Sequence, residues 1–187
     1  MRNLSRVHLV AVVGVVGMVT VVVGSVAGCG SSTEIDGLAA FTRVDVNDVG
    51  QSDGVRLAGN LSQTLLTPGF LRGEGGNGLR LNANVAYSDH SDDEFTVWSP
   101  QIGPSFRLGV GGLYVEPGVT VGGAFAELGD DTEASWAVRP YGRVGLASDM
   151  FIVGVEGGYQ YSNLEFDFGD DPQAWYIGGY FGIRLGH

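Results

Sequence analysis

Lysine is absent from this 187-residue chain, and cysteine occurs once, as Cys29. A lone cysteine excludes a disulfide within the chain, so the fold must be stable without one. The chain has ten arginines and 21 acidic residues, which gives a formal net charge of −11. A chain this acidic lacks the basic patches that nucleic-acid phosphates require, so we predict no nucleic-acid partner. The 32 glycines follow no Gly-X-Y period and aromatic residues are plentiful, which favours a β-rich protein.

The N-terminus has the pattern of a bacterial export signal. A basic start is followed by an apolar run that ends in Val26-Ala27-Gly28-Cys29. This order of basic, apolar and small residues is typical of a secretory signal peptide. The small residues before the cysteine resemble the lipobox of bacterial lipoproteins, in which the thiol receives a diacylglycerol. We therefore predict a signal peptide with lipobox at 1–28, lipidation at Cys29 and a lipidated tether at 29–37. An ordinary signal peptide, with Cys29 incidental, stays the alternative.

Beyond the tether, period-two alternation recurs and no convincing run at helical period is found. Eight segments of about nine to fifteen residues alternate in polarity and are bounded by turn residues. A tilted strand needs about 9–11 residues to cross a bilayer, so this length and spacing suit a membrane-spanning β-barrel. Short connections favour antiparallel, up-and-down pairing. The predicted strands are 38–47, 54–65, 79–88, 95–109, 113–127, 134–147, 151–163 and 173–186.

Alternation alone does not say which face of the barrel is inside. A soluble lipocalin-like barrel puts its apolar face inward, whereas a membrane barrel puts it outward against lipid. The polar face carries seven arginines and few carboxylates among small residues, and arginine's planar fork suits enclosed carboxylates. A genome that prefers arginine codons is the alternative explanation. The predicted lumen charge network is Arg43, Asp45, Arg56, Arg80, Arg107, Glu116, Arg139, Arg143, Glu156 and Arg184.

Aromatic residues and acidic loops also favour the lipid-facing arrangement. Six aromatic residues share the apolar parity and lie near one set of connections, as an interfacial girdle does. In a soluble barrel they would instead cluster at one mouth. The connections after the first, third, fifth and seventh segments are acidic, whereas those at Gly111-Gly112 and 148–150 are tight. The predicted aromatic girdle is Tyr87, Trp98, Phe125, Trp136, Tyr161 and Trp175.

The alternating strands, the glycine-rich turns and the closing segment Trp175–His187 resemble the small outer-membrane β-barrel superfamily of OmpA-like and OprF-like porin-type domains. The resemblance covers residues 38–187 and implies extracellular odd-numbered loops. Many of its members end in an aromatic residue and carry an ordinary signal peptide, whereas this chain ends in His187 and looks lipidated. Gly30 stands where inner-membrane lipoproteins carry an aspartate, so the lipobox resemblance implies the outer membrane as destination.

Catalytic and metal chemistry have little support in the sequence. His90, flanked by Ser88, Asp89 and Ser91, is the one candidate for a lipid-modifying centre, but adjacent loop residues rarely provide nucleophile–base geometry. The acidic clusters at 130–133 and 167–171 do not have the spacing of a calcium loop. We predict no enzyme activity, no metal and no cofactor.

These patterns predict an all-β protein whose barrel domain, residues 38–187, is an eight-stranded antiparallel up-and-down barrel of transmembrane type. The predicted function is non-catalytic: a lipid-anchored outer-membrane protein with a structural or surface-interaction role and acidic extracellular loops. Its expected partners are outer-membrane lipid, the covalent diacylglycerol at Cys29 and an unidentified extracellular or envelope partner. Eight strands enclose no aqueous channel, so the charges should act as a plug. The alternative is a membrane-tethered lipoprotein whose soluble lipocalin-like barrel binds a small apolar ligand.

Overall fold

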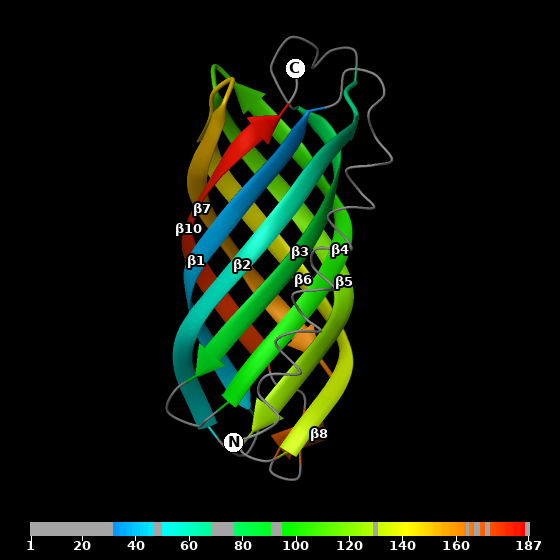
Figure 1. Cartoon of the computed structure of the whole chain (residues 1–187), viewed down its shortest axis with the longest axis vertical. Coiled ribbons are helices and arrows are strands. Elements are labelled where there is room, and N and C mark those ends of the chain that lie inside the picture. Colours follow the sequence, from blue (N-terminus) through cyan, green and yellow to red (C-terminus); the bar gives the residue numbers. More distant parts are fainter. Residues whose placement is uncertain are drawn as a thin grey trace. The chain divides into compact units, whose positions relative to one another are not determined.

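Eight long strands close into one antiparallel barrel (Figure 1). The computed structural model describes residues 32–46, 50–68, 77–90, 95–128, 131–163, 165–166, 169–170 and 173–185. Each strand pairs with its neighbour in sequence, and β10 pairs with β1 to complete the circle. The predicted eight-stranded up-and-down barrel is therefore confirmed. Its strands are β1 (Thr33–Val46), β2 (Gly50–Leu66), β3 (Gly78–His90), β4 (Phe95–Val110), β5 (Leu113–Leu128), β6 (Asp131–Ala147), β7 (Phe151–Ser162) and β10 (Gln173–Leu185).

The two ends of the barrel differ in their connections. At one end, here called the turn end, β4 meets β5 through Gly111 and Gly112, whose φ values of 61° and 89° suit a tight hairpin turn. At the same end, the β6–β7 turn is held by Ser148, whose hydroxyl accepts a hydrogen bond from the backbone N–H of Phe151 at 3.0 Å. The opposite end, here called the loop end, carries the connections after β1, β3, β5 and β7. The last of these includes a short pair of strands, β8 (Glu165–Phe166) and β9 (Gly169–Asp170).

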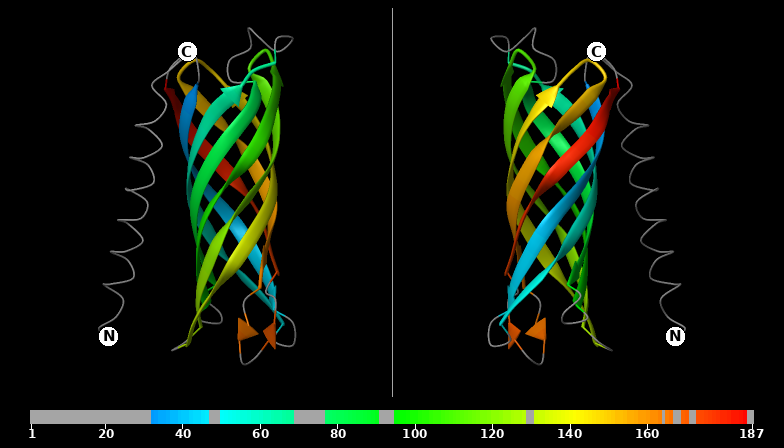
Figure 2. Two further views of the ribbon diagram at one scale, coloured as in Figure 1. Left: turned by 90° about the vertical axis from the view of Figure 1, so that its right-hand side faces the viewer. Right: turned by 90° about the vertical axis from the view of Figure 1, so that its left-hand side faces the viewer.

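The strands run obliquely around the barrel, as the two side views show (Figure 2). No helix long and apolar enough to cross a membrane occurs among the residues that the structure describes. The predicted signal peptide, Cys29 and most of the acidic loop residues lie outside the described residues.

The first strand begins earlier than predicted. β1 starts at Thr33, so residues 33–37, predicted to be tether, pair with β2 and β10. The sequence boundary of 38 was wrong because the charged residues Glu34 and Asp36 were taken for a solvated linker. In the barrel their side chains point inward. They therefore continue the period-two alternation of the strand, as uncharged polar residues on the inner face do.

The two faces of the barrel wall have opposite polarity. Outward-facing apolar side chains are exposed on every barrel strand, among them Val121 at 50%, Val155 at 51% and Ile177 at 54%. Inward-facing residues on the same strands are buried and are largely polar or charged, such as Thr120, Glu156 and Tyr176. This is the reverse of a water-soluble barrel, whose buried face is apolar.

Candidate functional site: a charged network inside the barrel

The barrel interior holds six arginines and four carboxylates among the described residues. Eight of these were predicted from the sequence: Arg56, Arg80, Arg107, Glu116, Arg139, Arg143, Glu156 and Arg184. The other two carboxylates are Glu34 and Asp36 of β1, which sequence reasoning assigned to the tether. Strand alternation brings all ten side chains to one face, and closure of the barrel brings them together.

Arg43 and Asp45, which were predicted to belong to this network, lie on the outer face of β1 instead. The inward residues of β1 are the even-numbered ones, Glu34 through Val44. Arg43 pairs across the outer surface with Asp53 of β2, with 2.9 Å from Nη2 to Oδ2. Their assignment to the lumen was wrong because the segment from 38 has apolar residues on both faces, so its parity is ambiguous until Glu34 and Asp36 are included.

Glu34 is the centre of the cluster nearest the turn end. Its carboxylate accepts hydrogen bonds from Arg107 at 2.6 and 2.8 Å, from Arg80 at 2.8 Å and from Arg184 at 2.9 Å. These arginines come from β4, β3 and β10, so one β1 side chain links four strands. The two contacts from Arg107 form the bidentate fork that gives an arginine–carboxylate pair its directionality.

Glu116 of β5 extends the Glu34 cluster across the interior. It accepts hydrogen bonds from Arg107 Nε at 2.7 Å and from the hydroxyl of Ser105 at 2.6 Å. Arg80 Nε lies 3.8 Å from the same carboxylate. The cluster therefore has three guanidinium groups on two carboxylates and carries one excess positive charge.

A second cluster lies farther toward the loop end and is centred on Arg143. Its guanidinium reaches Asp36 at 3.0 and 3.2 Å and Glu156 at 2.6 Å. Glu156 also accepts hydrogen bonds from Arg139 at 3.2 Å and from the Tyr176 hydroxyl at 2.7 Å. Two arginines and two carboxylates make this cluster neutral. An enclosed ion pair is stable only when its remaining donors and acceptors are also bonded, and these groups meet that condition.

Tyrosine rings pack against the guanidinium groups. Arg107 lies 3.9 Å from the ring centroid of Tyr114, and Arg143 lies 4.9 Å from that of Tyr180. The hydroxyls of these two tyrosines are hydrogen-bonded to each other. The predicted strand pattern places both tyrosines on the polar face, but sequence reasoning did not assign them a role. Their parity, shared with the arginines, is the signal that indicates cation–π contacts.

Arg56 lies apart from both clusters. Its Nη1 donates to Gln160 at 3.2 Å and to Ser88 at 3.3 Å, and its guanidinium carbon is 4.8 Å from the Tyr176 ring centroid. No carboxylate of the described residues is paired with it. Its Nε and Nη2 have no hydrogen-bond partner among the described atoms, although the side chain is fully buried.

An apolar layer lies on the loop side of these charges. On each of its strands, the buried apolar residue stands nearer the loop end than the charged interior residue does, as Phe95 and Val97 do relative to Arg107 on β4. The layer consists of Val44, Phe95, Val97, Ala124, Ala126 and Ala137. Apolar side chains are poor ligands for water and ions, so this layer offers no counter-charge to the arginines on its turn side.

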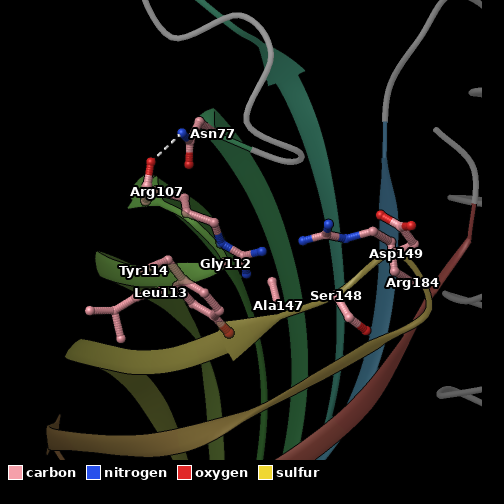
Figure 3. Close-up of a pocket in the computed structure, with 10 residues that line it drawn as sticks. Asn77, Arg107, Gly112, Leu113, Tyr114, Ala147, Ser148, Asp149 and Arg184 are labelled. Atoms are coloured by element: carbon pink, nitrogen blue, oxygen red, sulfur yellow. Dashed lines mark hydrogen bonds between the residues drawn. The ribbon is translucent and has the colours of Figure 1, made fainter.

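The turn end is open by contrast. A cavity of about 230 Å³ lies there, with Arg107 and Arg184 on its wall together with Tyr114 and Asn77. Figure 3 shows the two guanidinium groups extending toward one another across the cavity. Solvent can therefore reach the edge of the Glu34 cluster, which carries one excess positive charge.

The six residues of the predicted aromatic girdle all lie on the outer face of the wall. Tyr87 and Trp98 pair across β3 and β4 with ring centroids 4.8 Å apart, and Trp98 is in register with Phe125. Trp175 lies beside Phe41, at 5.6 Å. Trp136 and Tyr161 stand on β6 and β7 on the same side of the wall.

His90 is not a loop residue. It is the last residue of β3, is buried, and faces inward with its ring 5.7 Å from that of Phe95. Ser88 shares this face, whereas Asp89 is exposed on the other. The three residues thus do not converge as a catalytic set. In the part of the chain that the structure describes, no group of three or more His, Cys, Asp or Glu side chains is placed to share a metal ion.

The comparisons with known proteins give a likeness of fold and no family. No family model matches the sequence, and no curated protein does. The structure is similar to Neisserial surface protein A, with a TM-score of 0.69 and 12% identity over 83% of this chain and 99% of that one. It also aligns with Ail of Yersinia pestis in complex with the heparin analogue sucrose octasulfate (TM-score 0.46, 18% identity, 83% and 99% covered). A further alignment is with the N-terminal β-barrel domain of Pseudomonas aeruginosa OprF (TM-score 0.43, 14% identity, 82% and 97% covered). The first of these likenesses shows a shared eight-stranded barrel fold.

Proposed function

We propose that this chain is a lipid-anchored barrel of the bacterial outer membrane that spans the bilayer and has a structural or surface-interaction role without catalysis. The observation that carries the proposal is the reversed polarity of the wall. Exposed valine, leucine and isoleucine cover the outside, while the buried inner face is largely polar and charged. In a bilayer this arrangement satisfies both faces, because acyl chains contact the apolar wall and the backbone hydrogen bonds are closed within the barrel.

The same polarity argues against a soluble carrier of apolar ligands. Such a carrier needs an apolar cavity, but the cavity at the turn end has arginine, asparagine and tyrosine on its wall. Next to this cavity, the interior is occupied by the Glu34 and Arg143 clusters. We infer that the enclosed charges close the barrel to bulk flow and hold its strands rigid, because eight strands leave an interior that side chains fill.

An arginine scan of the outer wall tests membrane insertion. Val121→Arg and Val155→Arg place a charge on the apolar wall, away from the strand ends. In a membrane barrel each should cost about 2–4 kcal/mol of folding free energy if it lies near the bilayer midplane. The control Met150→Arg adds the same charge at the exposed β6–β7 turn and should cost about 0–1 kcal/mol. Urea unfolding in lipid vesicles, followed by heat-modifiable gel mobility, measures these costs. Equal, near-zero costs at all three positions would refute insertion.

Lipid anchoring has a separate test. The full chain is expected to incorporate labelled palmitate in a Gram-negative host, and Cys29→Ala is expected to lose the label. If the barrel itself inserts, the Cys29→Ala protein should still resist extraction from outer membranes by alkaline carbonate, because one inserted barrel anchors more firmly than an acyl chain. Label that persists in Cys29→Ala would disprove lipidation at this residue.

Absence of catalysis is tested through the candidate centre at His90. We expect His90→Ala to leave the lipid A composition of the host unchanged relative to wild type. A difference that depends on His90 would overturn the non-catalytic assignment.

A further inference from the structure

The interior carries more positive than negative charge, although the chain as a whole is strongly acidic. Six guanidinium groups face four carboxylates among the described residues, which leaves an excess of two positive charges. One belongs to the Glu34 cluster, beside the open cavity at the turn end, where solvent can screen it. The other belongs to Arg56, which lies on the loop side and does not line that cavity.

Arg56 has little compensation from its neighbours. Its nearest partners, Gln160 and Ser88, are neutral and both engage the same nitrogen, Nη1. Tyr176 adds a cation–π contact, but Arg139 shares that ring, with its guanidinium carbon 5.9 Å from the centroid. Both oxygens of Glu156 already accept hydrogen bonds from Arg139 and Arg143. A buried charge without a counter-charge is unfavourable, so a bound anion would stabilise this guanidinium.

The unused part of Arg56 has the geometry of an anion-binding fork. Nε and Nη2 stand on the same edge of the planar guanidinium and donate in parallel, as in bidentate anion recognition. Neither has a hydrogen-bond partner among the described residues. We propose that this edge of Arg56 binds a small monovalent inorganic anion, chloride under ordinary conditions, as a permanent counter-ion inside the barrel.

The surroundings favour chloride over a larger or more highly charged anion. The apolar layer of Val44, Phe95, Val97 and their neighbours lies toward the loop end. The carboxylates of Asp36 and Glu156 are already neutralised by Arg139 and Arg143. One charge remains to be balanced, so a small monovalent anion, which costs less to dehydrate than a multivalent one, fits best.

The test measures stability of the folded full chain in detergent micelles after refolding in sodium chloride, sodium bromide or sodium gluconate at equal ionic strength. The melting temperature of the wild type should rise by an equal increment with each tenfold increase in halide above the dissociation constant, because a ligand of the folded state stabilises it logarithmically. Gluconate, a much bulkier organic anion, should give no such rise. Equal response to halide and gluconate would overturn the proposal.

Two variants locate the effect. Arg56→Gln removes the fork and should abolish the halide-specific rise, whereas Arg43→Gln, on the outer face, should retain it. Gln160→Glu places a carboxylate where an amide oxygen now accepts from Arg56 at 3.2 Å. This built-in counter-charge should make the protein insensitive to halide, even if Arg56→Gln fails to fold. A halide-specific rise that persists in Gln160→Glu would contradict the site.

Chloride NMR linewidths give an independent reading. Wild-type protein should broaden the chloride resonance more than Gln160→Glu does at equal concentration, and equal broadening would count against binding at Arg56. The experiment uses micelles and tests only the barrel interior. Its failure would therefore leave the proposed membrane location intact, and failure of the arginine scan would leave the anion site intact.

Discussion

The turn side and the loop side of the interior hold their arginines in different ways. On the turn side, Glu34 accepts hydrogen bonds from three arginines, and a cavity opens beside them. On the loop side, Arg56 is bonded only to neutral side chains, and an apolar layer lies beyond it. The difference follows from where the carboxylates stand in the sequence. Glu34 and Asp36 lie at the turn-end start of β1, and Glu116 lies near the turn-end start of β5. The two sides should therefore respond differently to loss of charge.

The largest effect is expected on the turn side from Glu34→Gln. The substitution leaves Arg80, Arg107 and Arg184 with Glu116 as the one carboxylate of their cluster. Breaking a buried pair costs about 3–5 kcal/mol because the remaining charge stays desolvated. Urea unfolding in micelles should show a loss of this order. It should also show that added chloride recovers part of it, since the turn side would then resemble the surroundings of Arg56.

The matched control is Glu127→Gln, on the outward-facing side of β5. It removes the same charge from a position that forms no ion pair with the network among the described residues, and it should leave stability nearly unchanged. Similar losses in the two variants would mean that net charge, and not the enclosed cluster, sets the stability.

Tyr176→Phe tests the boundary between the two sides. The Tyr176 hydroxyl donates to Glu156 at 2.7 Å, and its ring lies against Arg56. Loss of a hydrogen bond to a charged group should cost about 1.5–3 kcal/mol, while the ring contact with Arg56 is kept. Tyr161→Phe, on the outer wall, removes an exposed hydroxyl and serves as the control. Equal melting temperatures for the two variants would show that the hydroxyl of Tyr176 does not support Glu156.

Gly158→Ala tests the packing under the same ring. A Cβ at Gly158 would lie 2.5 Å from the Tyr176 hydroxyl oxygen, so the tyrosine must shift from the position in which it contacts Glu156 and Arg56. Overpacking of this kind costs about 1–3 kcal/mol. Gly59→Ala adds a methyl group with no atom within 4 Å and should be tolerated. Thermal melting of both variants measures the difference. A lower melting temperature for Gly59→Ala than for Gly158→Ala would contradict close packing of Gly158 against the Tyr176 ring.

Most of the fold could be predicted because each barrel strand repeats the same period-two signal. β4, β5 and β7 are within one residue of their predicted bounds, since Gly111-Gly112 and Ser148 mark the turns by their own chemistry. β1 was harder. Its residues 38–46 include apolar side chains on both faces, so the charged pair at its start is the best guide to its register.

Most of the residues of the charged network could be predicted from the sequence, but the ion pairs between them could not. Parity alone places Arg80, Arg107 and Glu116 inside. Which arginine meets which carboxylate depends on the stagger between strands that are distant in sequence, as for Arg107 and Glu34. A single chain of alternating residues does not contain that stagger. For the same reason, the isolation of Arg56 could be seen only once Gln160 was placed opposite it.

The smallest effect is expected from the one arginine–carboxylate pair that the structure describes on the outer wall. Arg43 and Asp53 are both partly exposed, and Arg43 also lies near the Trp175 ring, at 5.7 Å. Water and salt screen such a pair, so Asp53→Asn should leave the unfolding midpoint in micelles almost unchanged. The same bidentate geometry that supports the turn side from within would then contribute little outside it. A loss from Asp53→Asn that approaches the loss from Glu34→Gln would show that burial does not distinguish the two pairs.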